Sequence, residues 1–322
     1  MPQEARAPSL NNSTLTFSET HSIQAMFQAL AVTRPEHVFD NVDVVLSRGL
    51  LAHIVRFCGM GSKGFRVDAS LVRDSTLVFQ YRPVAGMLEP WPQSASLGLQ
   101  CEKSVAGYPA GLEDSYNHYR VLRYKLGPLE CVVSFEADAT TEPYSCTTSS
   151  GEGAETMARV ERSAADAVVV RRGHLTKQEH AVEIRSFSGT KWRPALEGGL
   201  TRLRFWFGCT GHVLVGRRYD ARGGGSFESV KLKDVRQKIR EFASHPRKYE
   251  ALGRLPPLIS ALKEAVRAAP NARAAFVFRG GGGANADVGG EIDVYSIEQE
   301  QEGPAIPQTA IEKFWTASRS KL

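Results

Sequence analysis

Two β-hairpin patterns constrain the fold of this chain more than any other feature. Residues 65–72 (FRVDASLV) alternate in polarity and lead through a short polar turn into the β-branched and aromatic run at 76–82. Residues 118–126 and 129–138 repeat this arrangement on either side of Gly127 and Pro128. Strands joined by short turns pair antiparallel, whereas parallel strands need a long crossover. The hairpins therefore favour an α+β chain with mixed sheets over a regular βαβ alternation.

Helical spacing surrounds these strands. Ile23, Met26, Phe27 and Leu30 fall on one face of an expected helix at 21–33. Further helices are expected at 43–58, 98–102, 196–208, 230–244, 250–269 and 311–318, and further strands at 166–172, 180–187, 212–220, 272–280 and 290–297. The helix at 250–269 is expected to be interrupted by Pro256 and Pro257, because proline lacks the amide proton that an internal helical residue donates.

The length of 322 residues is enough for one self-sufficient core, and 42% hydrophobic residues with 23% charged residues are ordinary for a globular chain. We predict a single domain over residues 19–322 after a flexible tail at 1–18. Residues 140–163 are polar and small and lack apolar anchors. Ordering such a segment gains little against its backbone entropy, so we predict a mobile insertion.

Charge and cysteine content limit the classes of function. The net charge of +5 allows a phosphate-bearing partner but does not demand one. The five cysteines are an odd number without a CxxC pair, which argues against a zinc ribbon or a disulfide framework. The chain has no long apolar run and no apolar signal core at its start, so we expect no membrane partner and a nuclear or cytoplasmic location.

Two short acidic motifs carry the candidate chemistry. Glu136 and Asp138 close the second hairpin, and Glu183 and Arg185 lie on a later expected strand. Residues i and i+2 of a strand point to one face, so each pair shares a face. Carboxylates on one face repel each other unless a cation or a proton lies between them, and Mg²⁺ and Mn²⁺ take such oxygen ligands. Each motif alone is also what an exposed strand face carries by chance.

In order along the chain, the motifs resemble those of the decapping exonuclease family, in its fungal branch. That family has G-Φ-x-Φ-E, then E-Φ-D, then E-Φ-K, where Φ is apolar. Here these patterns read GLQCE (98–102), EAD (136–138) and EIR (183–185). An arginine at the end of an earlier strand (Arg82), an FW pair (RFWFG, 204–208) and a strand running into VG-x-R (HVLVGRR, 212–218) match further family features. The resemblance covers about residues 65–220 and implies mixed sheets forming a core of the PD-(D/E)XK nuclease type, flanked by helices.

The resemblance implies an enzyme that hydrolyses RNA 5′ ends, by decapping, 5′ pyrophosphohydrolysis or 5′–3′ exoribonuclease action, with Mg²⁺ or Mn²⁺ as cofactor. The implied metal ligands are Glu102, Glu136, Asp138, Glu183 and the carbonyl of Ile184, the implied catalytic residues are Glu136, Asp138, Glu183 and Arg185, and the implied substrate-binding residues are Arg82, Arg120 and Arg217. The implied partners are an RNA 5′ end and a 5′–3′ exoribonuclease.

Two departures from the family pattern leave an alternative open. Arg185 stands where the family has lysine, and Gly208 stands where the family has a polar side chain. Guanidinium keeps the positive charge of lysine but not its compact shape or its ability to change protonation state. The alternatives are a catalytically impaired relative that binds RNA or stabilises a partner exonuclease, and a protein that has kept the fold alone.

Overall fold

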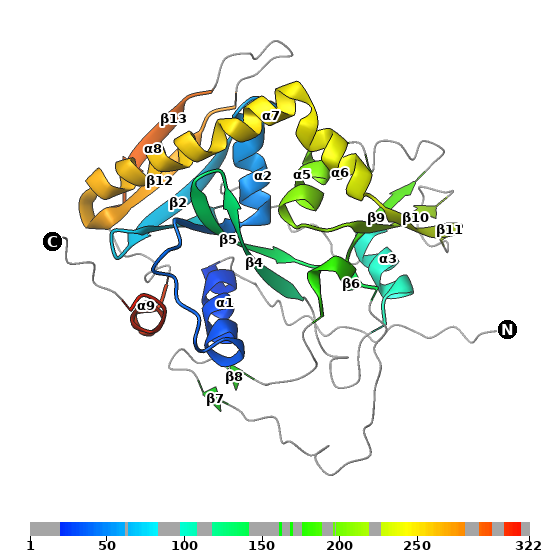
Figure 1. Ribbon diagram of the computed structural model, residues 1–322, viewed down its shortest axis with the longest axis horizontal. Helices are drawn as coiled ribbons and strands as arrows, with labels where there is room; N and C mark the ends of the chain where they lie inside the picture. The colour runs from blue at the N-terminus through cyan, green and yellow to red at the C-terminus, as the bar shows by residue number, and fades with distance from the viewer. Residues whose placement is uncertain are drawn as a thin grey trace.

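A seven-stranded mixed sheet is the centre of the computed structural model (Figure 1). The structure describes residues 20–61, 64–82, 97–107, 118–141, 161–162, 168–169, 176–188, 196, 198–218, 227–280, 290–297 and 306–316. The order of the sheet is β13-β12-β2-β3-β1-β5-β4. Its strands are β1 (Val44–Ser47), β2 (Phe65–Val72), β3 (Thr76–Arg82), β4 (Tyr119–Leu126), β5 (Leu129–Glu136), β12 (Arg273–Phe278) and β13 (Ile292–Ser296). The two predicted hairpins are β2–β3 and β4–β5, and both pair antiparallel.

The strand β1 corrects a prediction, because residues 43–58 were expected to form one helix. Val44 to Ser47 instead pair parallel with β3 on one side and β5 on the other. Only residues from Arg48 onward form the helix α2 (Arg48–Phe57), and the Ser47 hydroxyl accepts a hydrogen bond from the Leu50 amide at 3.2 Å as its N-cap. A β-branched run that is buried on both faces forms a central strand, and helical periodicity cannot reveal this.

Helices cover both faces of this sheet. Val44 and Leu46 face a core shared with α2, α7 (Pro246–Gly253) and α8 (Leu255–Ala268). Val45 points the other way, into a second core with α1 (Thr20–Thr33) and α9 (Gln308–Phe314). Figure 1 shows α8 along one face of the sheet, with α1 and α9 on the opposite side. Because successive side chains of β1 enter different cores, the sheet lies between two layers of helices.

A four-stranded mixed sheet extends the molecule beyond β5, in the order β11-β10-β9-β6. Its strands are β6 (Ala139–Thr140), β9 (Ala181–Ser188), β10 (His212–Arg218) and β11 (Ser229–Asp234). The helix α5 (Gly199–Phe207) packs on it through Phe205, and α3 (Leu97–Val105) also contacts β9. The described residues also form a separate pair, β7 (Glu161–Arg162) with β8 (Val168–Val169), and short 3₁₀ turns at Gln178–His180 and Pro270–Ala272. The expected α+β class with mixed sheets is confirmed.

Two further sequence predictions are wrong in detail. The predicted helix at 230–244 begins only with α6 (Arg236–Ser244), because Lys231 and Lys233 belong to β11, which pairs with β10. The predicted break in the helix at 250–269 lies at Arg254, where α7 ends and α8 begins, so Pro256 and Pro257 fall in the first turn of α8, where a backbone amide has no intrahelical acceptor.

The predicted tail, most of the predicted insertion and the glycine-rich loop after β12 lie outside the described residues. Within the described part of the chain, no helix is long and apolar enough to cross a membrane. The cysteines described there, Cys58, Cys101, Cys131 and Cys209, are unpaired.

Candidate functional site

The two acidic motifs lie close together at the junction between the seven-stranded sheet and the four-stranded sheet. The strand β5 ends at Glu136, and Asp138 follows it, so the two carboxylates do not share one regular strand. The Asp138 Oδ2 atom accepts a hydrogen bond from the Ile184 amide at 2.7 Å, and Ala139 pairs with Val182 at the start of β6. The Asp138 side chain therefore joins the end of β5 to the middle of β9, beside Glu183.

The helix α3 brings a further carboxylate, Glu102, to the same place. Cys101 on this helix is buried, and its sulfur lies against Gly216 of β10. A Cβ atom at position 216 would overlap the Cys101 sulfur and would lie 3.0 Å from the Phe227 ring. Glycine at position 216 therefore allows the close approach of helix and sheet that sets the position of Glu102.

The carboxylates influence one another's protonation. Burial, together with the charges of Asp138 and Glu136, raises the pKa of Glu102 to about 7. Burial, together with the Glu183 charge, raises the pKa of Asp138 to about 6, although the Ile184 amide opposes this shift. Desolvation also raises the pKa of Glu136, and the positive charges of Arg204 and Arg48 oppose this shift. The four acids therefore lie close enough to share one electrostatic environment.

Two arginines hold Glu183, which is itself only 2% exposed. The Arg48 guanidinium donates to both of its carboxylate oxygens, at 2.7 Å to Oε2 and 3.2 Å to Oε1. Arg185 donates to Oε1 at 2.7 Å. Glu183 is thus an acceptor for guanidinium groups at both oxygens.

The described acids do not fit a divalent cation as they are arranged. No three Asp, Glu, His or Cys side chains among the described residues form a group that could hold a metal ion. Both Glu183 oxygens accept from guanidinium groups, and one Asp138 oxygen accepts from the Ile184 amide. Oxygen ligands of the right chemistry are present, but three of them, both Glu183 oxygens and Asp138 Oδ2, already accept hydrogen bonds from protein donors. The metal and catalytic roles of these residues stay predictions.

The predicted substrate-binding arginines differ in their surroundings. Arg120 donates to the Thr176 carbonyl and hydroxyl and to Gln178, so it holds the segment that precedes β9. Arg217 lies 3.6 Å from Glu228 on the neighbouring chain segment. Arg82 ends β3 as expected, and its side chain lies outside the described residues.

Arg48 and Arg204 complete the site. Arg48 was not among the residues expected at this site from the sequence. Arg204, on α5, lowers the pKa of both Glu136 and Arg185 through its charge. No local pattern could reveal Arg48, because it meets Glu183 across 135 positions of the chain.

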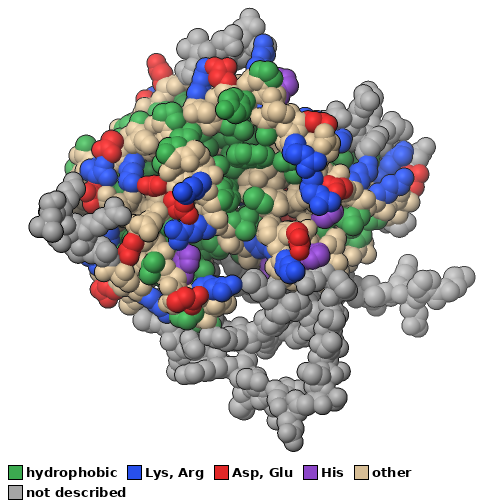
Figure 2. Space-filling model, viewed as in Figure 1, with side chains coloured by type: hydrophobic (Ala, Val, Ile, Leu, Met, Phe, Trp, Pro, Cys, Tyr) green, Lys and Arg blue, Asp and Glu red, His purple; other side chains and the backbone are tan. Residues whose placement is uncertain are grey.

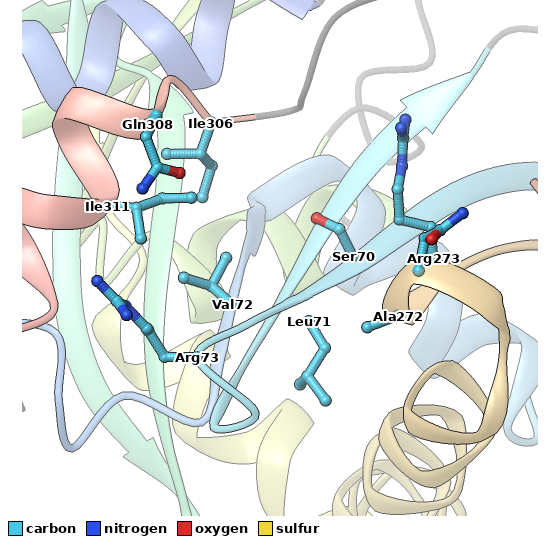
Figure 3. A pocket seen from close by; sticks show the side chains of 10 residues that line it. Ser70, Leu71, Val72, Arg73, Ala272, Arg273, Ile306, Gln308 and Ile311 are labelled. Carbon is cyan, nitrogen blue, oxygen red and sulfur yellow. The ribbon is translucent and has the colours of Figure 1, made fainter. Parts of the chain in front are cut away.

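A surface pocket lies apart from this site, between the β2–β3 turn, the start of β12 and α9 (Figure 3). Arg73 and Arg273 lie on opposite sides of it, and Leu71, Val72 and Ile311 supply its apolar wall. None of the acidic residues discussed above lines this pocket. The face of the molecule shown in Figure 2 intersperses Lys and Arg with Asp and Glu, so the net positive charge does not gather into one stripe there.

Comparison with known families gives a match over nearly the whole chain. A family model described as "Domain of unknown function (DUF8563)" matches residues 1–315. The chain belongs to this DUF8563 family. No curated protein matches the chain in sequence.

Solved structures show which fold this DUF8563 member has. Candida albicans Rai1 in complex with pU5-Mn²⁺ aligns with a TM-score of 0.55 at 9% identity, over 92% of this chain and 80% of that one. Scheffersomyces stipitis Rai1 in complex with (3′-NADP)⁺ and calcium ion aligns with a TM-score of 0.52 at 10% identity, over 91% and 78%. S. pombe Rai1 aligns with a TM-score of 0.50 at 14% identity, over 80% and 74%. The resemblance to the decapping exonuclease family is therefore confirmed at the level of the fold.

Proposed function

We propose that this chain binds RNA 5′ ends and that the arginine-bound carboxylate cluster is the place where the 5′ phosphate is recognised. The observation that carries this proposal is that the guanidinium groups of Arg48 and Arg185 bind Glu183, in a chain that shares its fold with Rai1. The Rai1 structures at TM-scores of 0.55 and 0.52 hold pU5 and (3′-NADP)⁺ respectively, and both molecules carry phosphate groups.

Charge balance explains why arginines are needed at this place. Four neighbouring carboxylates would repel a phosphate, and Arg48 and Arg185 offset part of their charge. Arg204 is half-buried and forms no side-chain hydrogen bond or ion pair with another described residue. A planar guanidinium with open donors suits a terminal phosphate, so Arg204 is our candidate for direct phosphate contact.

Binding experiments with matched RNAs test this proposal. One labelled RNA sequence would be prepared with a 5′ triphosphate, monophosphate, unmethylated cap, NAD cap or hydroxyl, and its affinity measured by fluorescence anisotropy in EDTA. We expect tighter binding of the phosphorylated 5′ ends than of the hydroxyl end. Arg204→Gln should remove that preference, while Arg240→Gln, on the exposed face of α6, should keep it. Equal affinity of the wild type for all ends would refute the proposal.

Metal-dependent hydrolysis of RNA 5′ ends is the second candidate function. The convergence of Glu102, Glu136 and Asp138 favours it, because acids of raised pKa cluster at catalytic sites. Incubation of the same RNAs with Mg²⁺ or Mn²⁺, followed by identification of the released products, tests it. Cleavage that Glu136→Gln with Asp138→Asn abolishes would establish hydrolysis, whereas unchanged RNA would leave binding as the function.

A 5′–3′ exoribonuclease partner belongs to the same proposal and rests on the resemblance of the motifs alone. Co-purification of the tagged chain with such an enzyme, with and without RNase treatment, tests whether the contact is direct.

A further inference from the structure

We propose that Arg48, together with Arg185, takes the place of a cation at Glu183, so that this chain neutralises its central carboxylate with its own side chains. Glu183 then binds no divalent ion. This inference goes beyond the proposed RNA binding, because it concerns the protein without any RNA.

The contact between Arg48 and Glu183 has the geometry of a strong ion pair. The guanidinium meets the carboxylate with two donors, at 2.7 Å and 3.2 Å, and the two side chains are 3% and 2% exposed. Paired, charge-assisted hydrogen bonds of this kind fix orientation as well as charge. Water competes little for either group at this depth, so the pair does not exchange freely with ions from solution.

A metal ion at Glu183 would meet two positive groups. The Oε1 atom accepts from both Arg48 and Arg185, and the Oε2 atom accepts from Arg48. A divalent cation would have to displace at least one guanidinium and would then lie beside a fixed positive charge. Like charges at such distances in a buried site repel strongly.

The surrounding fold makes room for Arg48. It occupies the first turn of α2, which Ser47 caps, and its guanidinium lies 4.6 Å from the centroid of the Phe135 ring and donates to the Glu136 carbonyl at 3.3 Å. A Cβ atom at Gly208 would lie 3.0 Å from the Arg48 Nη1 atom, so a larger residue at position 208 would crowd the guanidinium. Position 208 is also where the resemblance places a polar side chain, so both departures from the family pattern, Arg185 and Gly208, adjoin Arg48.

Titration with Mn²⁺ in the absence of RNA tests the inference. Binding would be followed by calorimetry and by the melting temperature of wild type, Glu183→Gln, Arg48→Met and the control Arg279→Met, which breaks an exposed ion pair with Asp293. We expect wild type, Glu183→Gln and Arg279→Met to respond alike to Mn²⁺. Arg48→Met should bind Mn²⁺ at least about tenfold more tightly and should be stabilised by it, because Glu183 then keeps only Arg185, and its Oε2 atom no longer accepts from a guanidinium group.

The outcome is decided even if Arg48→Met does not fold. Wild-type Mn²⁺ binding that Glu183→Gln weakens would overturn the inference, because Glu183 would then be a metal ligand. Equal responses of wild type and Glu183→Gln would support it, whether or not the ion binds elsewhere on the chain. If Arg48→Met folds and does not bind Mn²⁺ more tightly than Arg279→Met, the inference fails. None of these results depends on RNA, so they are separate from the test of the proposed function.

Discussion

Arg48 and Glu183 are 135 positions apart, yet they form a buried, two-donor ion pair that joins α2 to β9. The pair connects the helical layer on the large sheet to the small sheet that carries the second acidic motif. The folding of the core and the state of the candidate site therefore depend on the same contact.

Arg48→Met should strongly destabilise the protein. Removing one partner of a buried pair leaves an uncompensated charge, and the loss is typically about 3–5 kcal/mol. Urea denaturation should show a lower midpoint for Arg48→Met than for the surface control Arg279→Met. The double variant Arg48→Met with Glu183→Leu should recover much of the loss, and no recovery would mean that packing of the arginine, not its charge, matters.

Arg185 should matter for phosphate recognition through its charge. Its guanidinium is part-buried beside Glu183, and burial lowers its pKa. Arg185→Ala should remove the preference for phosphorylated RNA 5′ ends in the anisotropy assay, whereas Arg185→Lys should keep it within about threefold. If the chain hydrolyses RNA with Mg²⁺ or Mn²⁺, Arg185→Lys should also raise turnover, and a neutral effect in a fast enzyme would show that arginine is tolerated at this position.

Gly216→Ala should displace α3 and the Glu102 that it carries. The added methyl group would overlap the Cys101 sulfur, and overpacking of this kind typically costs about 1–3 kcal/mol. Thermal unfolding should show the loss, and Gly253→Ala, where a Cβ atom meets nothing within 4 Å, is the matched control. Adding Cys101→Ala should restore stability to Gly216→Ala, and failure to do so would place the strain elsewhere.

Trp315→Phe should weaken the docking of the C-terminal segment. The Trp315 indole donates to the Thr76 hydroxyl at 2.8 Å, and that hydroxyl donates to the Val42 carbonyl at 2.8 Å. The substitution keeps an aromatic ring in the cluster with Phe27 and Phe39 but removes a buried donor, which should cost about 1–3 kcal/mol in urea denaturation. An unchanged midpoint would show that the hydrogen bond contributes nothing measurable.

Stability of the metal-free protein should fall as the pH rises from about 4.5 to 7. The pKa of Glu102 is raised to about 7 in the folded state, from an ordinary value of 4.5, so folding favours the protonated acid. Its contribution is therefore complete below about pH 4.5 and is lost as the pH rises through 7. Because Glu102 is partly exposed, we expect about 1 kcal/mol, measured by urea denaturation in EDTA. Glu102→Gln should make this part of the pH profile less steep but not flat, because Asp138, whose pKa is raised to about 6, still contributes, whereas the exposed Glu312→Gln should leave the profile unchanged.

Short-range sequence patterns were enough to predict the hairpins and the helix α1 and to identify the order of the acidic motifs. Polarity alternates every two residues along β2, and Ile23, Met26 and Phe27 recur at helical spacing, because each pattern depends only on neighbouring residues. Of the FW pair, Phe205 is buried and Trp206 packs against the core.

Only the tertiary structure decided where β1 and β11 lie and what holds Glu183. The strand β1 exists because its two neighbours, β3 and β5, supply parallel partners for a run that also reads as the start of a helix. In the sequence, Arg48 is an ordinary first-turn residue of α2, and the nearest acidic residue, Asp43, lies outside that helix. Its partner comes from β9, because a charge pair depends on distance in space, and the topology of the two sheets sets that distance.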